Sequence, residues 1–398
     1  MTLRNAGHAA WRQAAFPLIL AVSLIAVLAY YVGATLRVAA LRNADGASLA
    51  LIVQQGTRAA RAGPTDVGAL AADPLDQQAV NGVIVARARS SGDMSRAARQ
   101  VELLRHMGWR STVALQNLLW RAAATGDQAL VMDALDALLR RERLLGQIYP
   151  ILNVMTLNPD SRALLVQRLA GRPPWRRYYL MSASDLVRAP EVEGRYLVMR
   201  EVQRRGDPLA RNEVAPILPK LIADGSAEEA FALWRANNAG AVTQPLADTD
   251  FAAAARPSPL DALPIPFEWQ LGNGSGYSSN AGRDERGSFA SVDWDGRGAP
   301  ALMSQTTTAR AGRYQLDVTG DLPGTSWVEY VGFSLNCPNQ AAVGFVPRLT
   351  SPGLRAKLMT AEPVRCDFPV LQLSGLVHSG NAAVAVVLRT VRMERTGG

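Results

Sequence analysis

The spacing of apolar and polar positions changes twice along the chain. Residues 14–36 carry no charged side chain, residues 37–239 repeat apolar positions at helical spacing, and residues 267–398 alternate apolar and polar positions in short runs. A charge-free run of this length is enough for a helix to cross a hydrocarbon core of about 30 Å. Helical spacing predicts amphipathic helices, and alternation predicts half-buried strands. The pattern therefore predicts a multidomain α + β protein with one transmembrane helix, a helical region and an antiparallel β-sandwich.

The charge-free segment also predicts the topology of the chain. Arg4 and Arg12 precede it, and no acidic residue occurs before Asp45. Positive charge on one flank favours a cytoplasmic location for that flank, although two arginines beyond the span weaken the bias. We therefore expect a cytoplasmic tail over residues 1–13 and a single-pass protein of the bacterial inner membrane, with the bulk of the chain in the periplasm. A cleaved signal peptide is the alternative, because the run Val32-Gly33-Ala34 offers small residues for cleavage.

Glycine-aspartate pairs divide the helical region. The pairs Gly92-Asp93 and Gly126-Asp127 lie 126 − 92 = 34 residues apart, and each separates two apolar helical patterns. A glycine supplies the positive φ that ends one helix, and an aspartate near the start of the next helix complements its dipole. A third break, at Gly225, follows Gly126 by 225 − 126 = 99 residues, close to three such periods. The pair Gly206-Asp207 falls outside this register.

A helical hairpin that repeats every ~34 residues is the period of a tetratricopeptide repeat. Around the third break, large and small residues occupy the packing positions of that repeat, as do Ala97 and Val101 in the first copy. The four residues around the third break are Ile217, Leu221, Ala230 and Trp234. The region 37–239 thus resembles a degenerate tetratricopeptide solenoid over about 170 residues. The first copy lacks the usual Trp, Leu-Gly and Tyr. The resemblance implies a surface for a protein partner, and it carries over no binding residue.

One run inside the helical region combines arginines and aromatic residues. A proline pair precedes Trp175, Arg176, Arg177 and Tyr178, and prolines are favoured in the first turn of a helix. The spacing predicts that Trp175 and Tyr178 share one face and that the two arginines lie on the other. This run is either a binding surface for a sugar or an acidic partner, or a helix start whose aromatic rings fill the solenoid interior.

Composition changes again after the helices. Five prolines fall within residues 240–266, which predicts an extended linker with at most a short helix near Phe251. Short alternating runs follow, among them residues 288–294 and 328–335, and glycine-rich turns such as residues 320–324 separate them, as expected for an antiparallel sandwich. The segment 304–316 ends in a Gly-x-Tyr-x-Leu motif at residues 312–316. It resembles a strand segment of jelly-roll carbohydrate-binding modules. That resemblance implies a carbohydrate-binding-like sandwich over residues 267–398.

Aromatic residues of the sandwich have two interpretations. They could stack on a sugar ring, provided that at least two share a solvent face, or they could pack in the core. The residues concerned are Trp269, Tyr277, Trp294, Trp327 and Tyr330.

The chain has two cysteines, Cys337 and Cys366. Two are too few for a zinc or iron–sulfur site built from cysteine alone. The first ends a predicted strand and the second begins another, so a disulfide is expected if the domain lies in an oxidising compartment. Two unpaired buried thiols are the alternative.

Little in the sequence points to a reactive centre. The three histidines lack metal spacing, and no Gly-x-Ser-x-Gly motif surrounds the serine nearest His378. Asp293 and Asp295 precede a glycine and form a weak calcium candidate, with too few ligands for a full loop. The formal net charge is +8, but arginines are spread along the chain, which disfavours nucleic-acid binding. We expect no cofactor.

A solenoid joined to a sandwich on a membrane anchor resembles bacterial envelope proteins that assist polysaccharide assembly or export. The resemblance implies a non-enzymatic scaffold that binds a protein through the solenoid and a glycan or second protein through the sandwich. Two alternatives remain. The protein could be a glycan-active enzyme with a carboxylate pair in the sandwich, or a pure protein–protein adaptor.

Overall fold

The computed structural model describes residues 126–142, 145–238, 244–257, 262–322, 327–351, 353–376 and 383–396, together with isolated positions from 112 to 123. The predicted transmembrane segment and the first predicted repeat lie outside these residues. Among the helices that the structure describes, none is both long and apolar enough to cross a membrane. The chain divides into two compact units, Met1–Arg176 and Arg177–Gly398.

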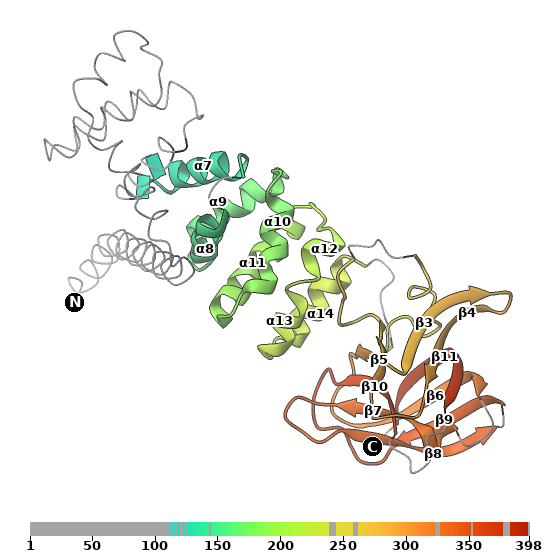
Figure 1. Cartoon of the computed structure of the whole chain (residues 1–398). Coiled ribbons are helices and arrows are strands. Elements are labelled where there is room, and N and C mark those ends of the chain that lie inside the picture. The colour runs from blue at the N-terminus through green and yellow to red at the C-terminus, as the bar shows by residue number, and fades with distance from the viewer. Residues whose placement is uncertain are drawn as a thin grey trace, which may run out of the picture. The chain divides into compact units, whose positions relative to one another are not determined.

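The first unit contains three described helices of equal length, green in Figure 1. They are α7 (Gln128–Leu139), α8 (Leu145–Thr156) and α9 (Pro159–Ala170). Gly126 has φ 72°, and the Asp127 carboxylate caps α7 by accepting the Leu130 N–H at 3.0 Å. The predicted roles of this glycine-aspartate pair are therefore confirmed.

In the second unit, too, glycines with positive φ end helices. Gly206 (φ 79°) and Gly225 (φ 83°) end helices, because glycine adopts positive φ without the Cβ clash of other residues. The helices are α10 (Arg176–Met181), α11 (Ala189–Arg204), α12 (Arg211–Val214), α13 (Leu218–Ala223) and α14 (Ala227–Ala236), with a 3₁₀ turn at Ser182–Asp185.

The third predicted hairpin corresponds to α13 and α14, which contact each other across Gly225. All four residues assigned to packing positions are buried, with at most 5% of each exposed. These residues are Ile217, Leu221, Ala230 and Trp234. The pattern thus predicted correctly which positions of this hairpin face the interior.

An antiparallel sheet of 11 strands forms the rest of the second unit. Its strand order is β1-β5-β10-β7-β8-β9-β6-β11-β4-β3-β2. The edge strands β1 and β2 lie close in sequence, and β1 and β5 both contact β3, so the sheet is nearly closed and sandwich-like. The predicted mixed α + β class is confirmed.

The strands lie in the yellow-to-red part of Figure 1. Their bounds are β1 (Gln270–Leu271), β2 (Asn273–Gly274), β3 (Tyr277–Asp284), β4 (Gly287–Trp294), β5 (Ala301–Thr306), β6 (Arg313–Leu322), β7 (Val331–Asn336), β8 (Val343–Ser351), β9 (Gly353–Thr360), β10 (Val370–Gly375) and β11 (Val384–Thr396). A short helix, α15 (Trp327–Tyr330), precedes β7.

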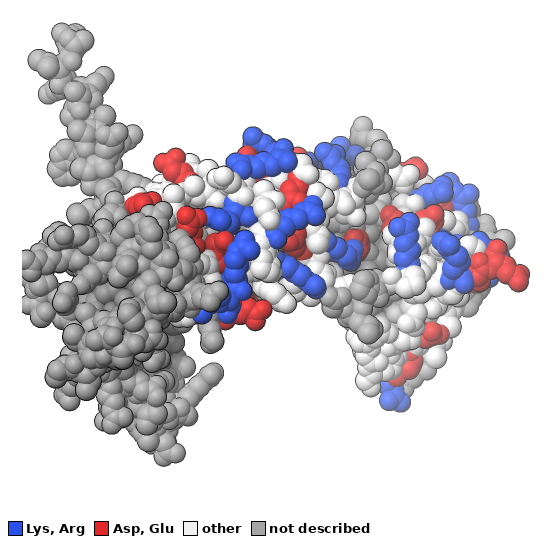
Figure 2. Space-filling model, turned by 90° about the horizontal axis from the view of Figure 1, so that it is seen from above, with Lys and Arg blue, Asp and Glu red and all other residues white. Residues whose placement is uncertain are grey.

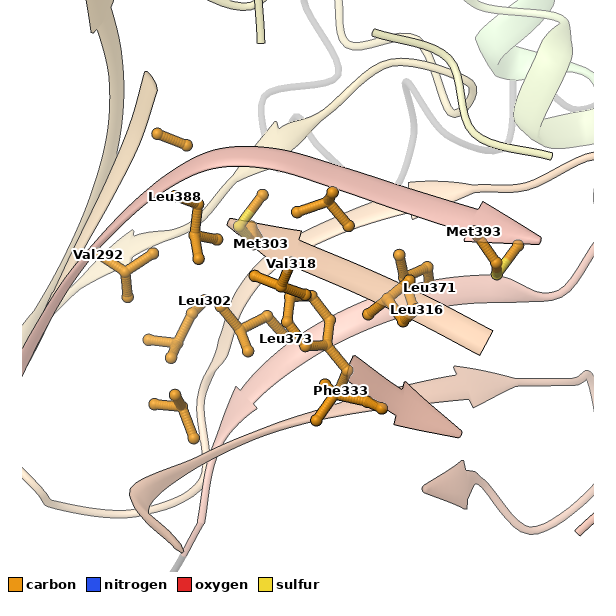
Figure 3. Packing of buried hydrophobic residues seen from close by; sticks show 14 of the residues in the cluster. Val292, Leu302, Met303, Leu316, Val318, Phe333, Leu371, Leu373, Leu388 and Met393 are labelled. Atoms are coloured by element: carbon orange, nitrogen blue, oxygen red, sulfur yellow. The ribbon is translucent and has the colours of Figure 1, made fainter. Parts of the chain in front are cut away.

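Strict alternation along the central strands builds the core. Strand β6 alternates buried and outward residues over its whole length, because successive side chains of a strand point to opposite faces. Figure 3 shows Leu316 and Val318 of this strand converging with Leu371 and Leu373 of β10. Strands β6 and β10 are separated by three others in the sheet, so the sheet curls and buries one face against itself.

Residues 244–257, which follow the helices, pack against the sheet. Leu246 and Phe251 belong to the same core and are 1% and 0% exposed. Thr249 accepts a backbone hydrogen bond from Val391 at 2.8 Å. The Asp248 carboxylate accepts the N–H groups of Ala253 and Ala254, both at 2.7 Å. This part of the predicted linker therefore forms a turn that covers the sheet.

Two predicted details of the β region are wrong. The glycine-rich segment 320–324 was expected to be a turn, but β6 continues through Gly320 to Leu322. Likewise, the run beginning at Val328 was expected to be a strand, but its first residues belong to helix α15. A β-bulge between Thr319 and Leu322 accommodates Gly320 inside β6. The hydropathy pattern does not show where such a bulge shifts the register between two strands.

Candidate functional site

A groove on the helices of the second unit is the best candidate for a functional site. Two cavities, of about 460 and 500 Å³, lie along α11 and share Tyr196, Arg200 and Glu229. The first lies between α11 and α14, and the second reaches the turn between α13 and α14. Both volumes fall in the range of about 300–1,000 Å³ that is typical of binding sites.

Both signs of charge line this groove. Arg200 and Arg204 of α11 are exposed, as are four carboxylates along its walls. The four carboxylates are Glu193, Asp224, Glu228 and Glu229. The Tyr196 ring is 8% exposed and forms part of the floor. A groove of this composition suits a polypeptide segment that carries charge, because long side chains of either sign find a counter-charge there.

The Arg-aromatic run near residue 175 does not form the predicted surface. Trp175 and Arg176 are buried, at 3% and 5% exposed, whereas Arg177 is exposed and Tyr178 is 61% exposed. The expected pairing of the two rings on one face is therefore wrong, because α10 starts after the proline pair and the buried positions are consecutive at its first turn.

Trp175 belongs instead to a polar cluster inside the first unit. Its indole N–H donates to Asp136 at 2.8 Å. Asp136 also accepts from Arg140 at 2.9 Å and from Arg168 at 3.3 Å. Arg176 donates to the Leu169 carbonyl at 3.2 Å. These contacts tie α7 to α9 and satisfy a carboxylate that is 7% exposed, since a buried charge is tolerated only when it is paired.

The aromatic residues that were candidates for a sugar face lie mostly in the core. Trp269, Trp294 and Trp327 are 7%, 3% and 1% exposed, and Tyr277 and Tyr330 are half-buried against the same cluster. Two of the indole N–H groups donate to backbone carbonyls at 3.0 Å. The three tryptophan rings therefore pack against other side chains, whereas the two tyrosines keep part of their surface exposed.

The structure does bring four predicted site residues to one place. Tyr277, Asp293, Trp294 and Asp295 line a recess of about 540 Å³ at the ends of β3, β4 and β11. Asp295 accepts the Arg297 N–H at 3.0 Å, which closes the turn after β4. Among the described residues, no group of three or more His, Cys, Asp or Glu side chains could hold a metal ion.

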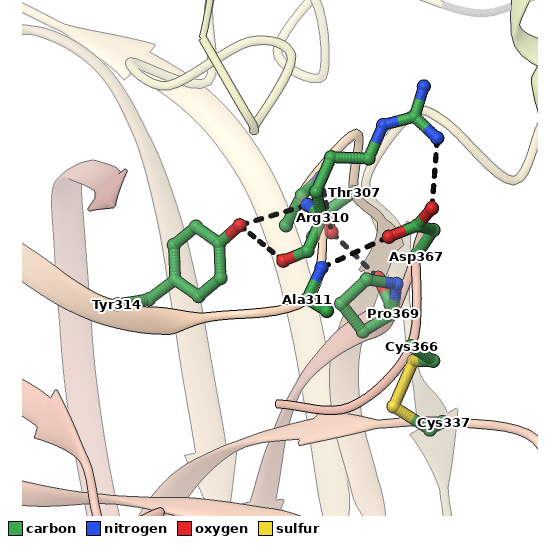
Figure 4. Close-up of a disulfide and its surroundings, with 9 residues drawn as sticks. Thr307, Arg310, Ala311, Tyr314, Cys337, Cys366, Asp367 and Pro369 are labelled. Carbon is green, nitrogen blue, oxygen red and sulfur yellow. Dashed lines mark hydrogen bonds and ion pairs between the residues drawn. A yellow bond between two sulfur atoms is a disulfide. The ribbon is translucent and has the colours of Figure 1, made fainter. Parts of the chain in front are cut away.

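The predicted disulfide is confirmed. Cys337 follows β7, Cys366 precedes β10, and the two sulfurs are bonded with a Cα–Cα distance of 5.9 Å. The bond joins the ends of the segment that contains β8 and β9. Figure 4 shows the adjoining loop, where Asp367 bonds to Arg310 and the Ala311 N–H, each at 3.0 Å.

Ion pairs hold several carboxylates of the sheet in their charged form. The Ala311 N–H and the Arg310 guanidinium lower the pKa of Asp367. The Arg389 guanidinium lowers the pKa of Asp284, and that of Arg286 lowers the pKa of Asp321. A general acid for glycoside hydrolysis needs a raised pKa instead.

One carboxyl group of the second unit has a raised pKa. Burial raises the pKa of Asp248, although the N–H groups of Ala253 and Ala254 oppose this effect. Its two oxygens are engaged in capping the turn over the sheet, so Asp248 has an evident structural role.

The groove residues on α11 and α14 were not singled out by sequence reasoning. Arg200 and Arg204 of α11 and Glu229 of α14 are ordinary charged residues on amphipathic helices. Glu229 follows Arg200 by 229 − 200 = 29 residues, so their proximity is not visible in the sequence. The available signal was the predicted hairpin itself, since stacked hairpins create grooves between consecutive helices.

No protein-family model matches the chain, and no curated protein matches it.

Proposed function

We propose that this protein is a non-enzymatic scaffold whose helical groove binds an extended segment of a protein partner. In this proposal it is anchored in the bacterial inner membrane with most of the chain in the periplasm, and it assists envelope polysaccharide assembly or export. The observation that supports the proposal most directly is the pair of adjoining cavities along α11, which share Tyr196, Arg200 and Glu229.

The helical hairpin supports a tetratricopeptide-like interpretation of this region. Helices α13 and α14 contact each other across Gly225, with all four expected packing positions buried. Helix α11 contacts α13 and contributes the facing wall. Stacked hairpins of this kind offer an extended surface rather than a closed reactive centre.

The disulfide supports a location outside the cytoplasm. The bond between Cys337 and Cys366 joins the only two cysteines of the chain. Disulfides persist in oxidising compartments such as the periplasm and are rare in the bacterial cytosol. A periplasmic domain is what the charge-free segment 14–36 and its flanking arginines predict.

Surface charge supports a protein partner over a nucleic acid. Figure 2 shows Lys and Arg side chains interspersed with Asp and Glu on the face drawn, without a broad patch of one sign. The groove itself holds two arginines against four carboxylates. A phosphate backbone would be repelled by the carboxylates, whereas a polypeptide segment with both acidic and basic residues would find a counter-charge for each.

Charge reversal inside and outside the groove tests this proposal. The full chain carries an affinity tag in its native host, is chemically crosslinked in intact cells and is then purified. Arg200→Glu changes a residue shared by both cavities. Arg205→Glu is the matched control, because Arg205 is exposed on the same region of the chain and lines neither cavity.

We expect a reproducible crosslinked protein with the parent chain and with Arg205→Glu, and at least a 10-fold loss with Arg200→Glu. A partner that is retained equally by both variants would contradict the groove as the binding site. A chain that crosslinks to no protein would contradict the scaffold proposal as a whole.

A further inference from the structure

A further cavity, on the β-sheet, shares no lining residue with the helical groove. Its volume is about 380 Å³, and it is lined by segments from four places in the chain. Gly287 and Ser288 open β4, Thr319 to Asp321 belong to β6, and Arg389 and Thr390 belong to β11. Asp250, from the turn over the sheet, completes the lining together with Arg286.

Two β-bulges meet at this cavity. The pairing of β11 with β6 shifts register between Leu388 and Thr390, so that Arg389 is the extra residue. The pairing of β6 with β9 shifts between Thr319 and Leu322, which places Gly320 and Asp321 in the second irregularity. Bulges redirect side chains and occur often beside functional sites. Here both irregularities contribute residues to the same cavity.

Arg389 brings a largely buried guanidinium to the lining. Its side chain is 15% exposed and lies over the Phe289 ring, with the guanidinium carbon 5.1 Å from the ring centre. Two of its nitrogens donate to Asp284, one of them at 2.8 Å. Its Nε is buried and has no hydrogen-bond partner within the described part of the chain. One strong donor at this cavity is therefore unused, which is rare for a buried group.

The charges around the cavity alternate in sign. Arg389 lies between Asp284 and Asp321, and Arg286 pairs with Asp321 from the other side, at 2.9 Å for one of its two bonds. The cavity lining thus holds two arginines and two carboxylates, Asp250 and Asp321, while Asp284 pairs with Arg389 from beside the lining. The arginines lower the pKa values of Asp284 and Asp321, so these carboxylates remain ionised acceptors near neutral pH.

This balance favours a neutral ligand over an anionic one. An anion would have to displace a carboxylate from its arginine, because both arginines of the lining are already paired. A neutral ligand with several hydroxyl groups can donate to the carboxylates and accept from the guanidinium groups. Hydroxyl groups of Ser288, Thr319 and Thr390 add partners that both donate and accept, and the last two bond each other at 2.7 Å.

We propose that this double-bulge cavity binds a neutral sugar residue through its hydroxyl edges. No aromatic ring lines the cavity among the described residues, so recognition rests on charge-assisted hydrogen bonds rather than on stacking. The volume accommodates a monosaccharide-sized ligand. This inference rests on the proposed role in envelope polysaccharide handling and assigns it a ligand class and a site.

Sugar binding is measured on the full chain by saturation-transfer difference NMR, in a detergent that carries no sugar headgroup. The probes are glucose, mannose and N-acetylglucosamine. Inorganic phosphate is the anionic probe, and its binding is followed by line broadening of its phosphorus-31 signal because it carries no carbon-bound proton. Arg286→Ala removes a cavity residue that is well exposed, and Thr390→Val removes a lining hydroxyl at nearly constant volume. Arg355→Ala is the matched control, because Arg355 forms a similar paired contact with Asp317 on β6 but does not line the cavity.

We expect at least one neutral sugar to bind with a dissociation constant on the order of millimolar. Arg286→Ala or Thr390→Val should weaken it about 10-fold, and Arg355→Ala should leave it unchanged. The proposal is overturned if none of the three sugars binds, if only phosphate binds, or if both cavity variants bind as the parent chain does.

The two proposals fail separately. Loss of sugar binding together with Arg200-dependent crosslinking would reject the cavity and retain the scaffold. Sugar binding without any crosslinked partner would retain the cavity and reject the helical groove.

Discussion

The disulfide between Cys337 and Cys366 allows a quantitative stability prediction. It closes a loop with a sequence separation of 29 residues, which contains β8 and β9. In the chain-entropy model, a cross-link over n residues lowers the entropy of the unfolded chain by about 2.1 + 1.5R ln n cal/mol/K. For this loop the relation corresponds to a stabilisation of about 3.6 kcal/mol at 25 °C.

The double variant Cys337→Ala/Cys366→Ala removes this constraint. Cys337 is 7% exposed and Cys366 is half-buried, so loss of the sulfur atoms adds a packing penalty of about 1 kcal/mol. We expect the free energy of unfolding of the second unit to fall by about 3–5 kcal/mol and its midpoint temperature to fall by about 10 °C. Denaturant titration and thermal melting of the full chain measure both quantities.

Reductant supplies the control for this experiment. It should shift the parent protein towards the stability of the double variant and leave the variant itself unmoved. A loss below about 1 kcal/mol would contradict a stabilising role of the disulfide, because the loop would then be constrained by the β8–β9 pairing without help from the cross-link. An effect of reductant on the variant would equally refute it, since no other cysteine exists.

Three further predictions concern packing and charge. Gly320→Ala should destabilise the protein by about 1–3 kcal/mol or more, because a Cβ there would lie 1.9 Å from the Val387 carbonyl oxygen, whereas Gly344→Ala, in open space, should stay within about 0.5 kcal/mol in denaturant titration. Trp327→Ala should lower the free energy of unfolding by about 3–5 kcal/mol, since the ring is 1% exposed; a fully stable variant would mean that the ring does not pack in the core. Asp367 has a lowered pKa in the folded state, so its contribution is present above the ordinary value of 3.8 and is lost as pH falls through the folded pKa; Asp367→Asn should flatten that part of a stability–pH profile, and an unchanged profile would contradict the assignment.

Local signals in the sequence predicted the helix breaks and the central strands well. The glycine-aspartate pair at Gly126 ends one helical segment and caps the next as expected, because φ preference and capping act over a few residues. The predicted strand at 288–294 differs from β4 by one residue at its start. Its alternation survives because one face is buried along the whole strand.

Other elements were missed for a physical reason. Strand β3 (Tyr277–Asp284) carries mainly polar residues, and most of its positions are half-buried or exposed, so its sequence lacks alternation. Strands β8 and β9 form the segment between the two cysteines, and pairing rather than hydropathy defines them. Backbone hydrogen bonds to neighbouring strands define these three strands, although their own hydropathy patterns do not indicate a strand.

The candidate sites depended on information that one sequence does not contain. Alternation cannot say which face of a sheet is inside, so Trp294 was equally compatible with a solvent face and with the core position that it occupies. The cavity at Arg389 depends on two bulges, and a bulge is a property of register between strands that are distant in sequence. The groove at Arg200 depends in the same way on how α11 packs against the hairpin of α13 and α14.

Photo-crosslinking from α14 probes the groove where the partner is proposed to bind. A benzophenone amino acid replaces Ala232, which is exposed and lines the groove, or Arg235, which is exposed on the same helix and does not. After irradiation of intact cells, we expect a discrete protein adduct from position 232 that Arg200→Glu abolishes, and no such adduct from position 235. Equal adducts from both positions, or none from position 232, would contradict a partner-binding groove.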